Sequence, residues 1–303
     1  MKGLELSRRF WEELLRPAIE AQAGELLPRL AAGLCGAGSD CLGYDDDCSR
    51  DHGFFAGCMV WLPASEGRET AFRLSAIYDR LPREFLGFPS EHRSRQGDGR
   101  YGVKTVEGFF RPLTGSEGAP RHWREWLSIP PGYLAEATAG EVFYDGPGVF
   151  TRIRQEILTG MPEDVRRKKL AARAALMAQS GQYNYARCLR HGEPGAARLA
   201  VDEFVRQTME TVFLLNRRHM PFYKWSFRAM RELPRLSQLA APLETLLASP
   251  DEALIENICA AVIGELRAQG LTAGDWDFLE PHAYEIMKRI TDPEIAALHV
   301  MEG

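Results

Sequence analysis

Apolar residues follow two different spacings along the chain, and the change of spacing separates two regions. In the first region, an amphipathic stripe over residues 4–21 predicts a helix that covers a core. Short apolar runs bounded by turn residues predict buried strands. We place strands at residues 29–34, 54–62, 101–106 and 141–144, a helix at 67–81 and a polar loop at 88–100. This alternation predicts a small mixed α/β domain.

Beyond residue 150, the three-to-four spacing of a helix is the dominant pattern. It predicts helices over residues 149–159, 162–179, 196–216, 222–232, 236–248, 251–269 and 280–299. We therefore predict an α+β protein, with a mixed α/β domain over residues 1–150 and an all-α helical domain over residues 151–303. The sequence has no internal repeat and no low-complexity linker.

Charge is distributed unevenly over these regions. The chain has 37 Lys+Arg and 42 Asp+Glu, a net charge of −5. Residues 1–150 hold 17 basic and 22 acidic side chains (−5), residues 151–235 hold 17 and 8 (+9), and residues 236–303 hold 3 and 12 (−9). The overall acidity argues against a long nucleic acid as partner, whereas the basic block 151–235 fits a small polyanion or an acidic segment. A solvated helix surface is the plain alternative for the basic block.

Composition limits the class of protein further. With 45% hydrophobic and 26% charged residues, the chain can build a packed core and is not intrinsically disordered. No apolar run approaches the length of a membrane helix, and the first segment lacks the apolar centre of a signal peptide. We therefore expect a cytoplasmic protein without membrane contact. The six cysteines form no Cys-x-x-Cys pair, so free thiols are expected.

Candidate chemistry concentrates in residues 36–55, GAGSDCLGYDDDCSRDHGFF. The Gly-Ser turn in this segment can present backbone N–H groups and a hydroxyl to a triphosphate, because glycine lets the chain approach closely. Carboxylates that follow the turn can hold Mg²⁺ ions, which neutralise charge during phosphoryl or nucleotidyl transfer. A solvated, Asp-rich surface loop is the alternative from the pattern alone. The segment carries five aspartates: Asp40, Asp45, Asp46, Asp47 and Asp51.

The order of residues within this segment resembles a known superfamily. Gly38-Ser39, followed by Ser49-Arg50-Asp51-His52 before an apolar strand, resembles the signature of the polymerase-β-like nucleotidyltransferases, in which a Gly-Ser turn precedes Asp-x-Asp. The likeness extends to the DUF4037 family within that superfamily and covers most of residues 1–235. It implies a small nucleotidyltransferase-type α/β domain followed by a helical domain. The segments that carry it are MKGLELSRRFWEE, GSDCLGYDDDCSRDH, GEVFYDGPG, SGQYNYARCLRHGE and LLNRRHMPFYKW.

The resemblance also implies an activity. This activity is the Mg²⁺-dependent transfer of a nucleoside monophosphate from a nucleoside triphosphate to a hydroxyl-type acceptor on a small molecule or protein. Gly38 and Ser39 would hold the phosphates. The catalytic carboxylates would be Asp51, Asp47 and Asp46, with Asp51 and Asp47 as the metal ligands.

One position departs from the family pattern. Members usually have Asp-His-Asp, which would place carboxylates at Asp51 and at position 53, but position 53 is Gly53. A lone carboxylate binds Mg²⁺ weakly. We therefore keep two further hypotheses: a nucleotide-binding or regulatory module without catalysis, and a structural interaction protein in which residues 236–303 dock on the basic block. Glu107 is a candidate for the superfamily's third carboxylate, with an acidic residue at a helix start as the alternative.

In this superfamily a helical domain commonly closes over the nucleotide, so we expect the basic block to supply contacts to it. Asn184 and Arg187 are candidates, although they could equally hold the helices of the domain together. Tyr223 and Lys224 form a second candidate pair, because a lysine suits a phosphate and an aromatic ring can stack on a base. We expect Trp225 to lie in the core. Most side chains of a consecutive basic run are expected to be solvated, because they spread around a helix: Arg166, Arg167, Lys168 and Lys169.

Overall fold

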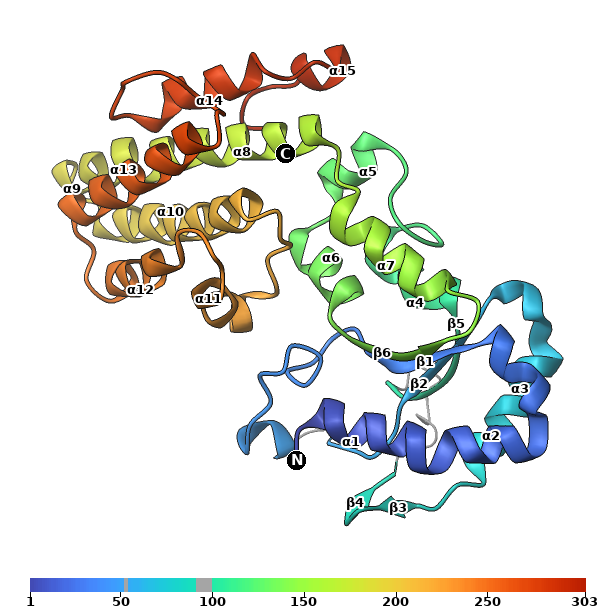
Figure 1. Ribbon diagram of the computed structural model, residues 1–303. Helices are drawn as coiled ribbons and strands as arrows, with labels where there is room; N and C mark the ends of the chain where they lie inside the picture. Colours follow the sequence, from blue (N-terminus) through green and yellow to red (C-terminus); the bar gives the residue numbers. More distant parts are fainter. Residues whose placement is uncertain (52–53, 91–99) are drawn as a thin grey trace. The chain divides into compact units, whose positions relative to one another are not determined.

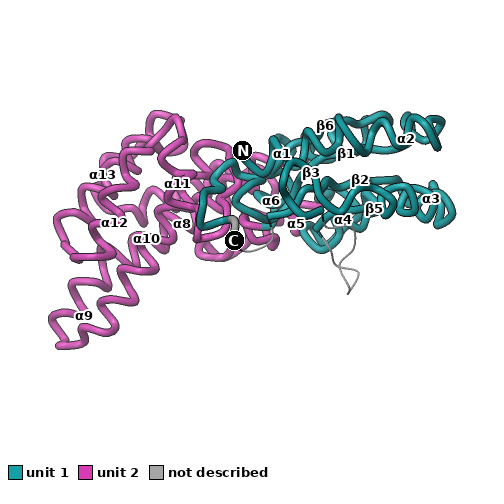
Figure 2. Tube along the Cα trace, turned by 90° about the horizontal axis from the view of Figure 1, so that it is seen from below, with its two compact units in different colours: residues 1–121, 133–160 teal, residues 122–132, 161–303 magenta. Residues whose placement is uncertain are grey.

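The computed structural model describes residues 1–51, 54–90 and 100–303, and the side chains over these ranges except at positions 50 and 51. It divides into two compact units, coloured in Figure 2. Unit 1 comprises residues 1–121 and 133–160, and unit 2 comprises residues 122–132 and 161–303. The sequence places the boundary at residue 150, and the division of the structure falls one helix later. Each unit has a hydrophobic core of its own.

Unit 1 is built on a four-stranded mixed sheet in the order β5-β2-β1-β6 (Figure 1). β1 pairs antiparallel with β2 and with β6, and β2 pairs parallel with β5. β1 and β2 are buried along their whole length, which suits their short apolar sequences. The sequence predicts all four strands, although β2 begins five residues after the start of the predicted run 54–62. The strands are β1 (Ala31–Cys35), β2 (Met59–Leu62), β5 (Gly102–Thr105) and β6 (Gly140–Asp145).

The amphipathic stripe of residues 4–21 forms one long helix with a π-helical turn at its centre. Its apolar residues share a buried cluster with Val60 and Leu62 of β2 and with the third helix. This burial of one helical face against the sheet is what the stripe predicts. The helical segments are α1 (Gly3–Phe10), η1 (Trp11–Leu15), α2 (Arg16–Ala23) and α3 (Gly67–Asp79).

A second group of aromatic residues packs around Trp61, the β2 residue between Val60 and Leu62. Successive side chains of a strand point to opposite faces of the sheet. Trp61 accordingly stacks on Phe150, with ring centroids 3.9 Å apart, and meets Phe109 edge to face at 5.6 Å. These partners belong to two further helices, α7 (Val149–Thr159) and α4 (Val106–Thr114).

Shorter elements complete this part of the chain. β3 and β4 form a separate two-stranded sheet, and short 3₁₀ turns connect the larger elements. The helices within residues 106–138 have no counterpart in the predicted set. The shorter elements are η2 (Gly24–Arg29), η3 (Cys48–Asp51), η4 (Ala64–Glu66), β3 (Glu84–Phe85), β4 (Phe88–Pro89) and α6 (Pro131–Thr138).

Unit 2 is all-helical, as predicted for the second half of the chain. The apolar residues of α8 and α10 lie at the centre of its core, together with residues of the C-terminal helices. The predicted helix 162–179 continues through a π-helical segment, and the predicted helix 280–299 is divided into two. The elements are α5 (Trp123–Ser128), α8 (Glu163–Met177), η5 (Ala178–Tyr185), α9 (Ala186–Arg190), α10 (Pro194–Leu215), α11 (Tyr223–Arg231), η6 (Ser237–Leu239), α12 (Ala240–Ala248), α13 (Glu252–Ala268), α14 (Leu279–Met287) and α15 (Pro293–Ala296).

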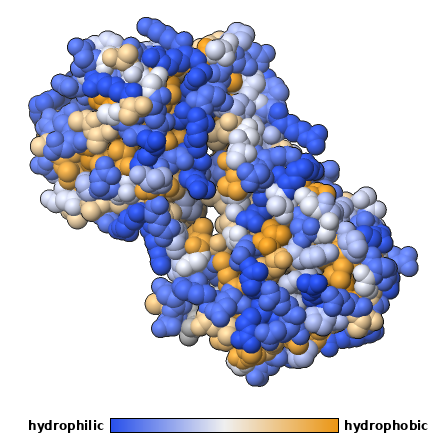
Figure 3. Space-filling model, viewed as in Figure 1, coloured by the Kyte–Doolittle hydropathy of each residue, from blue (hydrophilic) through white to orange (hydrophobic). Residues whose placement is uncertain are grey.

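The α+β class predicted from the sequence is confirmed by these two units. In the part of the chain that the structure describes, no helix is long and apolar enough to cross a membrane. Hydrophilic residues dominate the face shown in Figure 3, where hydrophobic residues form separate patches. The apolar side chains that predict the helices and strands therefore lie mainly in the hydrophobic cores of the two units.

Candidate functional site

The Gly-Ser turn follows directly on β1 and depends on glycine at two positions. Gly36 and Gly38 have φ angles of +100° and +125°, which side chains rarely allow. A Cβ atom on Gly38 would lie 2.5 Å from Asp40 Oδ1 and 2.6 Å from Arg100 Nη2. Ala37 and Gly38 are nonetheless exposed to solvent. The turn therefore carries its backbone at the surface, directly above a carboxylate and a guanidinium group.

Four consecutive backbone N–H groups of this turn, those of residues 37–40, have no acceptor among the described residues. The groups on either side are used: Gly36 N donates to Ala139 O at 3.4 Å, and Cys41 N donates to Asp40 Oδ1 at 2.8 Å. Successive N–H groups in a turn form a favourable site for an anion.

An ion pair and a hydroxyl contact hold the turn in place. Arg100 pairs with the buried carboxylate of Asp40 and donates from Nη2 to Cys41 Sγ at 3.1 Å. Ser39 Oγ donates to Ser49 Oγ at 3.1 Å, which ties the turn to the end of the Asp-rich loop. Burial raises the pKa of Cys41 to about 12, so this thiol stays protonated at neutral pH.

Arg100 has no role predicted from the sequence, because this residue ends the polar loop predicted over residues 88–100. Its partner Asp40 was grouped with the other loop aspartates. An arginine immediately before a predicted buried strand is the signal that could have drawn attention to it. The pairing itself joins residues 60 positions apart, which no local pattern specifies.

Two aspartates of the loop bind the chain's own donors. Asp45 is buried; its Oδ2 accepts from Gly3 N at 2.8 Å, and its Oδ1 lies 3.5 Å from Lys2 Nζ. Asp46 is exposed and accepts from both Ser49 N and Ser49 Oγ at 3.1 Å, so it caps the short turn η3. Asp45 therefore anchors the loop to the first helix. The predicted catalytic residue Asp46 already accepts hydrogen bonds from two donors of Ser49.

The described residues do not by themselves make a magnesium site. Over residues 1–51, 54–90 and 100–303, no three His, Cys, Asp or Glu side chains gather in a way that could hold a metal ion. Mg²⁺ requires carboxylates that are free to face it. Asp47 is exposed, whereas the side chain of Asp51 and all of Gly53 lie outside what the structure describes. The metal ligands predicted at Asp51 and Asp47 therefore stay a prediction.

Glu107 lies in the first turn of α4, where it accepts a hydrogen bond from Ala64 N at 2.9 Å. An acidic side chain in the first turn stabilises a helix. This position matches the helix-start alternative given above for Glu107.

Asn184 and Arg187, the first pair of candidate nucleotide ligands in the helical domain, lie in unit 2; Arg187 is exposed and Asn184 is half-buried. Gln182, their neighbour, donates to Glu256 Oε2 at 2.7 Å and accepts from Leu279 N at 2.9 Å, so it joins helices. Arg187 is exposed and lies over the Tyr183 ring, 5.5 Å from its centroid. Asn184 is half-buried, and its side chain makes no hydrogen bond within the described chain. Asn184 and Arg187 stay predicted nucleotide ligands.

Tyr223 and Lys224 begin α11 and are both exposed. Lys224 Nζ lies 5.4 Å from the centroid of the Trp225 ring. Trp225, expected in the core, is half-buried instead, because α11 turns its other residues inward. The roles predicted for Tyr223 and Lys224 toward a nucleotide stay predictions.

The expectation that the basic run of α8 is mostly solvated is wrong. Arg166, Lys168 and Lys169 are 4%, 0% and 6% exposed, because α8 packs in the middle of unit 2. Lys168 Nζ donates to Val300 O at 3.1 Å, and Lys169 Nζ donates to Leu127 O at 3.0 Å. Burial lowers the pKa of both lysines to about 8. These side chains bind carbonyl groups within unit 2 and are therefore not a solvated part of the basic block.

Ion pairs also join the basic block to residues 236–303. Arg231 and Glu244 approach to 2.5 Å, and Arg235 and Glu265 to 2.8 Å. Part of the predicted docking of the acidic segment on the basic block is therefore a packing feature inside unit 2. The Arg231–Glu244 pair is exposed on both sides, and a pair of this kind contributes little to stability.

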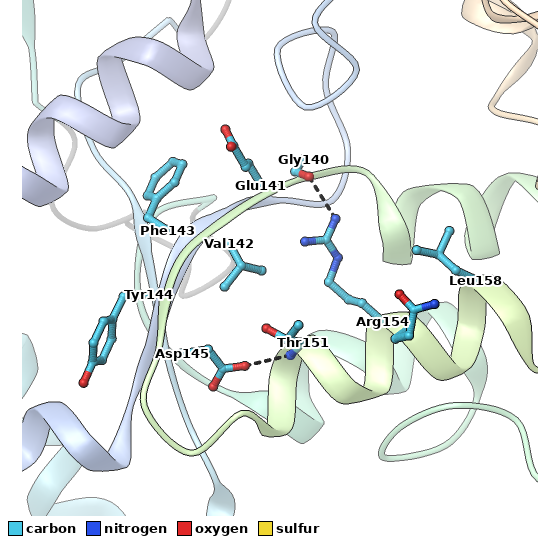
Figure 4. Close-up of a pocket in the computed structure, with 10 residues that line it drawn as sticks. Gly140, Glu141, Val142, Phe143, Tyr144, Asp145, Thr151, Arg154 and Leu158 are labelled. Atoms are coloured by element: carbon cyan, nitrogen blue, oxygen red, sulfur yellow. Dashed lines mark hydrogen bonds between the residues drawn. The ribbon is translucent and has the colours of Figure 1, made fainter.

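A pocket of about 410 Å³ lies between β6 and α7 in unit 1 (Figure 4). Arg154 reaches across it and donates from Nη2 to Thr138 O at 2.5 Å and Gly140 O at 2.8 Å. Asp145 Oδ2 accepts from Thr151 N at 2.8 Å and so caps the start of α7. Arg154 caps the carbonyl end of α6, which gives this cation a structural role.

Comparison with known proteins supports the family recognised from the sequence. Residues 126–226 match the model of the family "Domain of unknown function (DUF4037)". This segment contains three of the five sequence segments quoted above, from GEVFYDGPG to LLNRRHMPFYKW. No curated protein matches the chain at a significant level.

One similar solved structure is that of a nucleotidyltransferase-like protein from Exiguobacterium sibiricum 255-15. The two chains are 12% identical, and the match covers 90% of this chain and 80% of the other, with a TM-score of 0.38. A TM-score this low carries no residue role from one protein to the other.

Proposed function

We propose that this DUF4037 protein binds a nucleoside triphosphate at the Gly38–Ser39 turn and transfers the nucleoside monophosphate to a hydroxyl group of a small molecule or protein. One observation carries the proposal: the four successive backbone N–H groups of residues 37–40 donate to no acceptor in the described chain. Phosphate oxygens are the ligands that such a row of N–H groups binds best.

Two features next to the turn support a phosphate ligand. Gly38 is exposed, so a phosphate can reach its backbone from the solvent side, while Asp40 and Arg100 fill the space on the other side. Arg100 lies beneath the same residue and brings a positive charge to the turn, although Asp40 balances part of it. Ser39 adds a half-exposed hydroxyl, held by Ser49.

The proposed reaction is one displacement at the α-phosphorus. The acceptor oxygen forms a bond to this phosphorus, and the bond from phosphorus to the oxygen that bridges to the β-phosphate breaks. Pyrophosphate leaves with that electron pair, and the hydroxyl proton passes to solvent. The turn would position the triphosphate and stabilise the negative charge that develops on its oxygens. The described carboxylates do not by themselves form a magnesium site. If Mg²⁺ is bound, Asp51 and Asp47 would hold it, and it would neutralise charge on the triphosphate.

A nucleotide-binding module without catalysis is the second candidate. It is favoured by Gly53, which stands where the family usually has a carboxylate, and by the engagement of Asp40, Asp45 and Asp46 with the chain's own donors. Such a protein would keep the turn and bind nucleotide without turnover.

Thermal unfolding with ATP, GTP, CTP or UTP, each with and without Mg²⁺, separates the two candidates. The enzyme hypothesis predicts a rise in Tm that requires the metal, and pyrophosphate release once an acceptor is present. A rise that is independent of the metal, without pyrophosphate release, favours the silent module. The absence of any shift with all four nucleotides would overturn both.

Substitution at the predicted metal position sharpens the test. Asp51→Asn is expected to abolish pyrophosphate release while leaving nucleotide binding measurable. Unchanged release in this variant would show that Asp51 is not a metal ligand. Gly53→Asp restores the family's carboxylate, and a gain of activity in this variant would identify the natural chain as the silent form.

A further inference from the structure

Unit 2 exposes two neighbouring aromatic rings at the start of α11. Phe222 and Tyr223 are 66% and 74% exposed, and their ring centroids lie 4.5 Å apart. Single exposed apolar side chains are common on protein surfaces, whereas adjacent ones often mark a binding site. Neither ring belongs to the hydrophobic core of the unit. Their positions therefore need a cause other than packing within the unit.

Two basic residues lie close to these rings in the sequence: Lys224 directly follows Tyr223, and Arg218 stands four residues before Phe222. Lys224 and Arg218 are exposed, and neither has a carboxylate partner within the described residues. Most of their basic neighbours are paired: Arg217, for example, lies 2.9 Å from Glu163. Two exposed aromatic rings, together with two nearby residues in the sequence that carry a positive charge and form no ion pair among the described residues, match a ligand that has both a flat ring and a negative charge.

We propose that Phe222, Tyr223, Lys224 and Arg218 form a platform for a nucleoside phosphate. The base would stack on the aromatic pair, because every nucleobase has a π face that an aromatic side chain can cover. Lys224 and Arg218 would hold the phosphate as mobile charges. A polynucleotide fits less well, because residues 236–303 of the same unit carry 12 acidic and only 3 basic side chains.

This platform rests on the proposed function only in that its ligand is a nucleotide. The turn at Gly38 is a feature of unit 1, whereas the platform is argued wholly from unit 2. The two proposals can therefore fail separately.

Photolabelling with 8-azido-ATP, followed by peptide mapping, tests where the base lies. The label is expected on the peptide that contains Phe222 and Tyr223. Tyr223→Leu should reduce labelling about tenfold, the size of one base–aromatic contact. The matched control Tyr284→Leu, at a residue 49% exposed in the same unit, should label like the wild type. Neither substituted side chain is buried, so both variants are expected to fold.

Adenosine and tripolyphosphate separate the two parts of the ligand. Adenosine is expected to compete with the label, and Lys224→Ala should weaken competition by ATP more than competition by adenosine. Label confined to peptides outside residues 217–231, or equal labelling of wild type and Tyr223→Leu, would overturn the platform while leaving the turn hypothesis intact. Label on the platform, combined with unchanged ATP binding after Ala37→Asp, would overturn the turn and keep the platform.

Discussion

The burial of Lys169 predicts that stability rises at alkaline pH. Lys169 is 6% exposed, and burial lowers its pKa to about 8 from the 10.5 of a free lysine. Between these two values the unfolded chain binds a proton that the folded chain has lost. The free energy of unfolding therefore increases with pH across this window. From pH 7.5 to pH 9.5, this one side chain contributes a rise of about 2 kcal/mol.

Urea unfolding of the wild type and of Lys169→Met at both pH values measures this contribution. The wild type should gain about 2 kcal/mol more than the variant between pH 7.5 and pH 9.5. Comparing the two proteins cancels the opposing effect of buried thiols such as Cys259, whose pKa burial raises. Lys288→Met, at an exposed lysine of the same unit, should behave as the wild type does. Equal gains in wild type and Lys169→Met would refute the reasoning.

Three further substitutions test separate parts of the structure. Gly33→Ala should destabilise unit 1 by about 3 kcal/mol, because its Cβ would lie 2.4 Å from Glu141 O; a urea midpoint equal to that of the wild type would contradict this. Hydrogen bonds, first from the Thr272 hydroxyl, lower the pKa of Glu285 to about 2, so its stabilisation is present above pH 4.5 and is lost as pH falls toward 2. Glu285→Gln should therefore flatten the decline of Tm between pH 5 and pH 3, and parallel declines would count against it. Asp40→Asn should destabilise unit 1 by about 2 kcal/mol in urea unfolding, since it leaves the Arg100 guanidinium without its carboxylate; an unchanged midpoint would show that the pair is not needed.

Local patterns in the sequence were sufficient for most of the secondary structure. The helix over residues 149–159 and the strands at β1, β5 and β6 follow from the spacing of apolar residues, which burial against a neighbour enforces. The Gly-Ser turn could also be located, because glycine and serine between two apolar runs favour a turn. The helices within residues 106–138 were missed, since their short apolar stretches lie between Gly and Pro residues that indicate loops.

Long-range contacts account for what the sequence could not show. Lys168 is buried because α8 packs in the middle of unit 2, and its ammonium group donates to Val300 O, 132 residues further along the chain. A run of four basic residues looks like a solvated surface unless that contact is known. In the same way, the Arg100–Asp40 pair beneath Gly38 depends on the position of β5 next to β2. The chemistry of a candidate site depends on such pairings. They determine which carboxylates and which cations have no partner within the chain and can therefore bind a ligand.

The most direct test of the central claim is the affinity of the turn for a nucleoside triphosphate. Ala37 is exposed, so Ala37→Asp adds a negative charge beside the N–H groups of residues 37–40 with little effect on packing. Isothermal titration with ATP should show a loss of affinity of at least tenfold in Ala37→Asp, because the added carboxylate repels the phosphates. Ala37→Asn, which has the same shape without the charge, should stay within a few-fold of the wild type. Equal ATP affinity in the wild type and Ala37→Asp, under conditions where the wild type binds, would contradict the placement of the triphosphate at this turn.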